Sequence, residues 1–125
     1  LQYRYDEGKW TVKEVVLHLI DTERIFAYRA LRIARNDQTS LPGFDQDDYV
    51  PESKANERKI DSLLNEYRTV RMATIDLFDS LDDTVLMRIG TASNSNLSVR
   101  AAGFIIIGHE NHHCEVIRNR YLKNL

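Results

Sequence analysis

Apolar residues recur at spacings of three and four positions along three long stretches of this chain, and this pattern constrains its fold more than any other feature. The stretches cover about residues 12–34, 56–81 and 99–122. Such spacing gathers apolar side chains on one face of a helix. With 125 residues, of which 42% are hydrophobic, the chain is long enough for one core. We therefore predict an all-α fold, with residues 1–125 forming a single helical-bundle domain.

Local signals indicate where the helices begin and end. Thr11 followed by Glu14 is a capping-box pattern, and Asn36 with Asp37 is typical of a helix end. Residues 37–54 contain both prolines and an acidic cluster, and such a long connection is either a functional loop or a solvated crossover. Residues 84–96 are mixed in character, and a short hairpin is possible around residues 86–89.

The third predicted helix contains Gly103 and Gly108. Each glycine costs roughly 1 kcal/mol of helix stability relative to alanine, which predicts close packing or space for a ligand there. Three long helices do not close a bundle by themselves, and four is the common arrangement. The sequence begins at Leu1 instead of a methionine. We therefore expect a truncated domain whose first helix lies upstream of Leu1, with a partner chain as the alternative.

Composition disfavours several classes of function. The net charge of -2 and the pI near 6.1 provide no broad basic surface for nucleic acid. No apolar run approaches the roughly 20 residues that span a bilayer, so we expect no membrane partner. The single cysteine, Cys114, excludes an intramolecular disulfide, and a cytoplasmic protein is the simplest interpretation.

Histidines are the residues that most clearly suggest a functional site. His109 and His113 are four positions apart, which places both imidazoles on one helix face at a spacing that can chelate a metal ion. His18 lies among apolar residues of the first helix, where a lone histidine is more often a satisfied core residue than a ligand. Three inward-facing histidines are difficult to explain by packing, because every neutral ring has one donor and one acceptor to satisfy. One divalent metal would satisfy one nitrogen of each.

The same helix segment also matches H-E-x-x-H, the motif of zinc peptidases, over residues 109–113. In that scheme Glu110 is the general base. Only about a dozen residues follow to supply a third ligand, and no strand pattern offers a substrate-binding edge. A metallopeptidase is therefore a less favoured alternative.

Two stretches of the chain resemble the DinB/YfiT-like superfamily of metal-binding four-helix bundles. In residues 8–21, Trp10 opens a helix that carries His18 and, three positions on, Asp21. In residues 104–116, His109 is followed after a gap of three by His113, which is preceded by His112. The likeness covers nearly the whole chain, and the order and separation of the motifs make the combined match specific.

The resemblance implies a four-helix bundle with a long crossover and a first helix preceding Leu1. It implies His18, His109 and His113 as ligands, zinc or nickel as the metal, and a homodimer. Members of this family include thiol S-transferases that use bacillithiol or mycothiol, a mycothiol-dependent isomerase, and proteins described as metal-dependent hydrolases. We therefore expect any part of the site that the family's first helix supplies to come from residues upstream of Leu1.

Three imidazoles leave at least one coordination position open, which is typical of a catalytic metal. The expected function is a metal-dependent enzyme acting on a small molecule, either a hydrolase or a thiol S-transferase with a low-molecular-weight thiol. A non-catalytic, stress-associated metal-binding bundle is the alternative. Asp21 and Glu110 are candidate catalytic residues. Asp21 could equally be a carboxylate in solvent, whereas a surface position is the favoured interpretation for Glu110. Arg29 and Arg100 are candidates for binding an acidic substrate or thiol cofactor.

Overall fold

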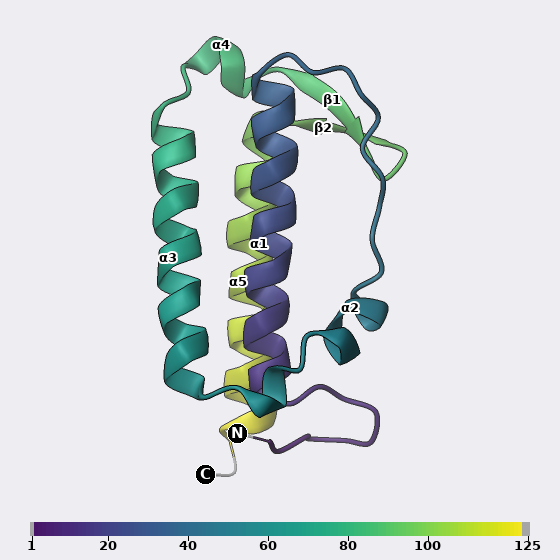
Figure 1. Cartoon of the computed structure of the whole chain (residues 1–125), viewed down its shortest axis with the longest axis vertical. Coiled ribbons are helices and arrows are strands. Elements are labelled where there is room, and N and C mark those ends of the chain that lie inside the picture. The colour runs from purple at the N-terminus through teal and green to yellow at the C-terminus, as the bar shows by residue number, and fades with distance from the viewer. Residues whose placement is uncertain (1, 124–125) are drawn as a thin grey trace.

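Three long helices lie side by side in the computed structural model, which describes residues 2–123 (Figure 1). They are α1 (Val12–Ala34), α3 (Ile60–Asp79) and α5 (Val99–Val116). Helices α1 and α3 run in the same direction and α5 runs in the opposite one (Figure 1). Helix α1 packs against both α3 and α5 and is the centre of the arrangement. The predicted all-α character is confirmed.

Both ends of α1 follow the expected local signals. The Thr11 hydroxyl accepts a hydrogen bond from the Glu14 amide, and the Glu14 carboxylate accepts one from the Thr11 amide at 2.7 Å. At the other end, Asn36 adopts a left-handed φ of 60°, and the Asp37 amide donates to the carbonyl oxygen of Arg32 at 3.0 Å. These are the capping box and the Schellman motif, which satisfy the free backbone groups of a helix end.

A long crossover returns the chain to the end of the molecule where α1 begins, as predicted (Figure 1). It contains a helix that the sequence analysis missed, α2 (Gln46–Glu52), followed by the 3₁₀ helix η1 (Ala55–Glu57). Asp45 begins α2 by accepting a hydrogen bond from the Asp47 amide at 2.9 Å. The predicted start of the second long helix near residue 56 is four residues too early, because the backbone is extended at Arg58 and Lys59.

A short helix, α4 (Asp83–Leu86), and a hairpin connect α3 to α5 at the far end of the bundle (Figure 1). The strands are β1 (Ile89–Ala92) and β2 (Ser95–Ser98), which pair in antiparallel register with Ala92 opposite Ser95. The turn residues Ser93 and Asn94 both have positive φ, as a two-residue type I′ turn requires. The hairpin therefore lies later than the predicted residues 86–89.

The third long helix ends as α5 at Val116 and continues as a π-helical turn, η2 (Ile117–Tyr121). The two glycines of α5 differ in their surroundings. A Cβ atom at Gly103 would lie 3.0 Å from the Phe78 ring, whereas a Cβ atom at Gly108 would meet nothing within 4 Å. Close packing, one of the two predicted reasons for these glycines, therefore applies to Gly103.

Two clusters of buried apolar side chains stabilise the fold. One lies at the hairpin end, with α1, β1, β2 and α5 as its walls, and it includes Ile33, Leu97, Val99 and Ala102. The other lies between α1 and the beginning of α3, and it comprises Val16, Leu17, Ile20, Ala55, Leu63 and Val70. Among the helices of residues 2–123, none is long and apolar enough to cross a membrane.

Candidate metal centre

His18 of α1 meets His109 and His113 of α5 inside the bundle. The Nε2 atom of His109 lies 2.9 Å from Nε2 of His18 and 3.1 Å from Nε2 of His113. All three ligand nitrogens lie within 4.8 Å of one another. His18 is only 5% exposed, whereas His109 and His113 are half-buried. The structure thus brings together the three histidines that the sequence analysis selected.

The surroundings favour neutral imidazoles. Desolvation by burial, followed by the proximity of His109 and His113, lowers the pKa of His18 from 6.5 to about 4. Burial and the neighbouring His109 and His112 likewise lower the pKa of His113 to about 4. The pKa of His109 is lowered in the same direction, mainly by burial. Near pH 7 all three rings are therefore neutral, which is the protonation state that binds a metal.

Hydrogen bonds among the three rings cannot satisfy all of the Nε2 atoms that meet here. The Nε2 atom of His109 is close to two other Nε2 atoms, yet a neutral ring nitrogen carries either one proton or one lone pair. It can therefore form one good hydrogen bond with these neighbours, not two. A divalent cation would accept one lone pair from each ring. Imidazole nitrogens bind zinc at roughly 2.0–2.1 Å, so the ligands of one ion lie close together, as these nitrogens do. The donor set therefore fits a metal ion.

The His18 ring contacts two residues outside the histidine cluster, Trp10 just before α1 and Thr22 within α1. The Trp10 ring lies 4.8 Å from the His18 ring, centroid to centroid. On the side away from the cluster, Nδ1 of His18 lies 3.5 Å from the hydroxyl oxygen of the buried Thr22. Thr22 was not among the predicted site residues, although its position four residues after His18 places the two on one helix face.

Asp21, a candidate catalytic residue, faces a different part of the molecule. The charged groups that act on its carboxyl are Arg24, Glu66 and Arg58, and burial raises its pKa. Thr22, and not Asp21, is the residue whose side chain reaches the His18 ring.

Glu110, the second candidate catalytic residue, belongs to an ion-pair network that joins the three long helices. Its carboxylate accepts a hydrogen bond from Arg71 of α3 at 2.6 Å. Arg71 also donates to both carboxylate oxygens of Glu23 of α1, at 2.8 and 3.1 Å, and to the hydroxyl of Tyr67 at 3.3 Å. Glu23 is 3% exposed, so this network compensates a buried charge. We name Glu23, Arg71 and Glu110 the interhelical ion-pair triad.

The two arginines proposed to bind a cofactor lie away from the histidines. Arg29 is eleven residues beyond His18 on α1, which is roughly 16 Å along the helix. It is buried, and it donates to the Pro42 carbonyl oxygen at 3.1 Å and to the Ser93 hydroxyl at 3.0 Å. Arg29 therefore attaches the crossover and the hairpin turn to α1. Arg100 is exposed at the beginning of α5, above the Phe104 ring.

A cavity of about 280 Å³ adjoins the histidine cluster on the side of His113. Its walls come from α1 and the segment before it, from α2, and from the end of α5 and η2. The lining residues are Tyr5, Gly8, Lys9, Trp10, Val15, Asp47, His112, His113, Val116 and Tyr121. The Tyr121 hydroxyl donates to the Trp10 carbonyl oxygen and so joins two of these walls. We name this space the His113 cavity.

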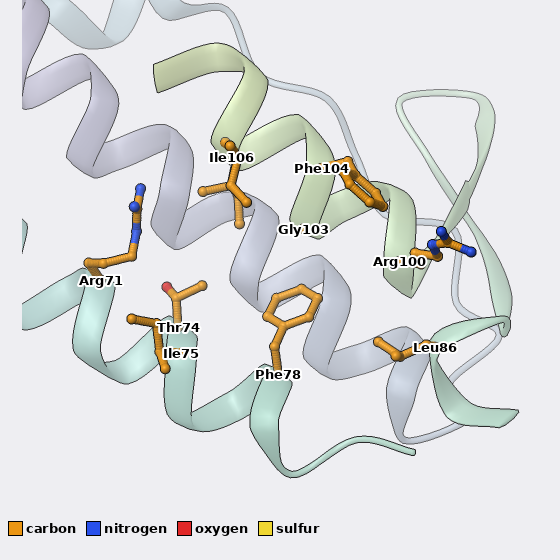
Figure 2. Close-up of a pocket in the computed structure, with 10 residues that line it drawn as sticks. Arg71, Thr74, Ile75, Phe78, Leu86, Arg100, Gly103, Phe104 and Ile106 are labelled. Carbon is orange, nitrogen blue, oxygen red and sulfur yellow. The ribbon is translucent and has the colours of Figure 1, made fainter. Parts of the chain in front are cut away.

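A second, larger hollow of about 530 Å³ lies between α3 and α5 (Figure 2). Its walls are mainly apolar, with Phe78 and Ile75 on α3 facing Phe104 and Ile106 on α5 (Figure 2). Phe104 is 63% exposed, so this part of the groove is open to solvent. Arg71 lies at one end of this groove and Arg100 at the other, while none of the three clustered histidines lines it.

Comparisons with known proteins agree with this architecture. The sequence pattern of the DinB superfamily matches residues 1–117. A protein of Oceanobacillus iheyensis, named "Putative metal-dependent hydrolase OB0413", is 28% identical over 124 residues, which span 94% of this chain and 68% of that protein. The solved structure of YfiT from Bacillus subtilis superimposes with a TM-score of 0.83 at 19% identity, covering 94% of this chain and 71% of that one. YfiT is described as "a probable metal-dependent hydrolase with an unusual four-helix bundle topology". From its sequence pattern, the chain belongs to the DinB superfamily.

Proposed function

We propose that this protein is a metal-dependent hydrolase whose divalent metal, zinc or nickel, is bound by His18, His109 and His113. One observation carries the proposal, namely that a ligand nitrogen from each of these three neutral imidazoles lies within 4.8 Å of the other two. Two relatives support it, since the names of both OB0413 and YfiT describe metal-dependent hydrolases.

The number of ligands favours catalysis over a structural role. Within residues 2–123, the metal-binding cluster consists of these three histidines without a fourth protein ligand. Structural zinc sites are usually closed by four protein ligands, whereas catalytic sites keep one position open. A metal bound here would lower the pKa of water at the open position and so supply a nucleophile near neutral pH.

The His113 cavity is the route by which we expect a substrate to reach the open position. Its lining combines the apolar surfaces of Trp10, Val15 and Val116 with the charged side chains of Lys9 and Asp47. Its volume of about 280 Å³ is just below the usual range for ligand sites, roughly 300–1,000 Å³, which favours a small substrate. The sulfur of a low-molecular-weight thiol could occupy the same position, so a thiol S-transferase is tested alongside the hydrolase.

Elemental analysis of the purified protein is the first test. We expect about one zinc or nickel per chain in the wild type and a large loss of metal in His113→Ala. His112→Ala is the matched control, because this neighbouring histidine is exposed and lies outside the cluster. A wild-type protein without stoichiometric metal, or equal metal contents in the two variants, would contradict the proposal.

Activity assays of the metal-loaded protein then separate the possible reactions. Hydrolysis of an ester and amide panel that disappears in His113→Ala supports the hydrolase. Turnover of electrophiles only in the presence of bacillithiol, mycothiol or glutathione would replace it with the transferase. Stoichiometric metal without turnover in either panel would favour the non-catalytic metal-binding bundle.

A further inference from the structure

We propose that Thr22 is a positioning residue for the metal centre, because its hydroxyl accepts a hydrogen bond from Nδ1–H of His18 and thereby keeps the Nε2 lone pair directed at the cluster. This inference rests on the proposed metal site and adds to it a residue outside the histidine motifs.

The orientation of the His18 ring is the first observation. Its Nε2 atom lies 2.9 Å from Nε2 of His109, so that nitrogen points into the cluster. Its Nδ1 atom lies 3.5 Å from the Thr22 hydroxyl oxygen, so the other nitrogen points away from the cluster and along α1. A neutral imidazole that binds metal through Nε2 must carry its proton on Nδ1. The ring therefore needs a hydrogen-bond acceptor where Thr22 is located.

Burial makes this acceptor important. His18 and Thr22 are 5% and 4% exposed, and the bond between them is buried. A buried N–H group without an acceptor carries a desolvation penalty that an exposed group avoids. Without the hydroxyl, the Nδ1–H form of His18 would lose its acceptor, and the alternative tautomer would place the proton on Nε2, where it blocks metal binding.

The three histidines differ in how far solvent can reach their ring nitrogens. His109 and His113 are half-buried, and His113 lines the His113 cavity, where solvent can satisfy a ring nitrogen. Among residues 2–123, Thr22 is the only side chain outside the cluster that forms a hydrogen bond with one of these three rings. We therefore expect His18 to be the preorganised ligand of the site and Thr22 to determine its tautomer.

Three variants test this role through metal affinity. Thr22→Val keeps the shape of the side chain and removes the hydroxyl, and outer hydrogen-bond partners of metal ligands typically contribute about 10–100-fold in affinity. We expect Thr22→Val to weaken zinc binding at least about tenfold in a competition titration with a chromophoric chelator. Thr22→Ser, which restores the hydroxyl, should bind within about twofold of the wild type.

Thr74→Val is the control for a general loss of stability. Thr74 is also buried and helical, and its hydroxyl donates to the Val70 carbonyl oxygen at 3.0 Å, but it lies on α3 outside the histidine cluster. It should leave zinc affinity unchanged. Equal affinities of the wild type and Thr22→Val would overturn the inference while leaving the metal site intact.

Nuclear magnetic resonance of the metal-free protein provides a readout that does not depend on metal. Long-range ¹H–¹⁵N spectra near pH 8 report which nitrogen of His18 carries the proton. The inference expects the Nδ1–H tautomer in the wild type, and an Nε2–H tautomer there would overturn it even if Thr22→Val failed to fold. A wild type that binds neither zinc nor nickel but shows Nδ1–H would refute the proposed function and leave the Thr22–His18 hydrogen bond in place.

Discussion

Arg71 of α3 donates a hydrogen bond of 2.6 Å to the carboxylate of Glu110, which directs the glutamate of the H-E-x-x-H match toward a guanidinium group. In a zinc peptidase that glutamate must activate a water molecule beside the metal. Here it is one of two carboxylates held by the same arginine, the other being the buried Glu23. The match to the peptidase motif is therefore better explained by an interhelical ion pair than by a general base.

Replacing Glu110 with glutamine tests this interpretation directly. We expect Glu110→Gln to retain metal and to lower the activity of the metal-loaded protein by only a few-fold, since the residue is engaged with Arg71. A general base would contribute about 10²–10⁴-fold. Metal content and kcat/KM on the best substrate of the ester panel are the measurements, and a hundredfold loss of kcat/KM at full metal content would restore Glu110 as a catalytic residue.

Arg71→Met should destabilise the protein by about 2–3 kcal/mol, because it leaves the carboxylate of Glu23 buried without a partner. The expected loss is below the roughly 3–5 kcal/mol of a fully buried pair, since the Arg71 side chain is 27% exposed. Urea unfolding measures the change. Arg24→Met is the control, because the Arg24 side chain is 54% exposed and its partner Glu66 keeps a second ion pair with Arg58. Such an exposed arginine is expected to contribute only about 0–1 kcal/mol. Equal losses for the two variants would contradict this account of the interhelical ion-pair triad.

The metal-free protein should lose stability as the pH falls from about 6.5 toward 4. In the unfolded chain the histidines bind protons below their ordinary pKa of 6.5, whereas folding lowers the pKa of His18 and His113 to about 4. Between these values the unfolded state binds more protons, so the histidine contribution to the free energy of unfolding decreases with falling pH, and only this contribution levels off below about 4. Urea unfolding at several pH values checks this, and His113→Asn should show a shallower dependence.

The two glycines of α5 should respond differently to alanine. Gly108→Ala should stabilise the protein by about 0.5–1 kcal/mol, because alanine favours the helix and the added Cβ meets open space. Gly103→Ala gains the same helix propensity, but its Cβ would lie 3.0 Å from the Phe78 ring, which must move. We therefore expect the melting temperature of Gly108→Ala to exceed that of Gly103→Ala, and the reverse order would contradict the packing seen here.

Much of the helical framework could be predicted from local signals. The capping box at Thr11 and the end of α1 near Asn36 depend on residues close in sequence, and the prediction placed both within a residue. The convergence of His18 with His109 and His113 was expected from periodicity and family resemblance together. Their meeting across 91 residues is a tertiary contact, and spacing along one helix alone does not establish it.

Other features depend on contacts that no local pattern reveals. Arg29 was a candidate for binding a cofactor, yet its position is explained by the Pro42 carbonyl oxygen and the Ser93 hydroxyl, which come from two distant segments. Helix α2 was missed because its seven residues, about two turns, contain a proline, Pro51, and show little apolar periodicity. The expected leading helix lies outside the described residues, and the expected homodimer stays a prediction that light scattering can check.

The sequence separation between His18 and His109 has a consequence for the unfolded chain. A link between residues 91 positions apart closes most of the protein into one loop. Cross-links that close loops of about 100 residues reduce the entropy of the unfolded state by an amount worth about 4–5 kcal/mol in a chain-entropy treatment. Any ion that stays bound to both histidines during unfolding would act as a reversible cross-link in the unfolded chain. Metal loading would then change the cooperativity of unfolding as well as its midpoint.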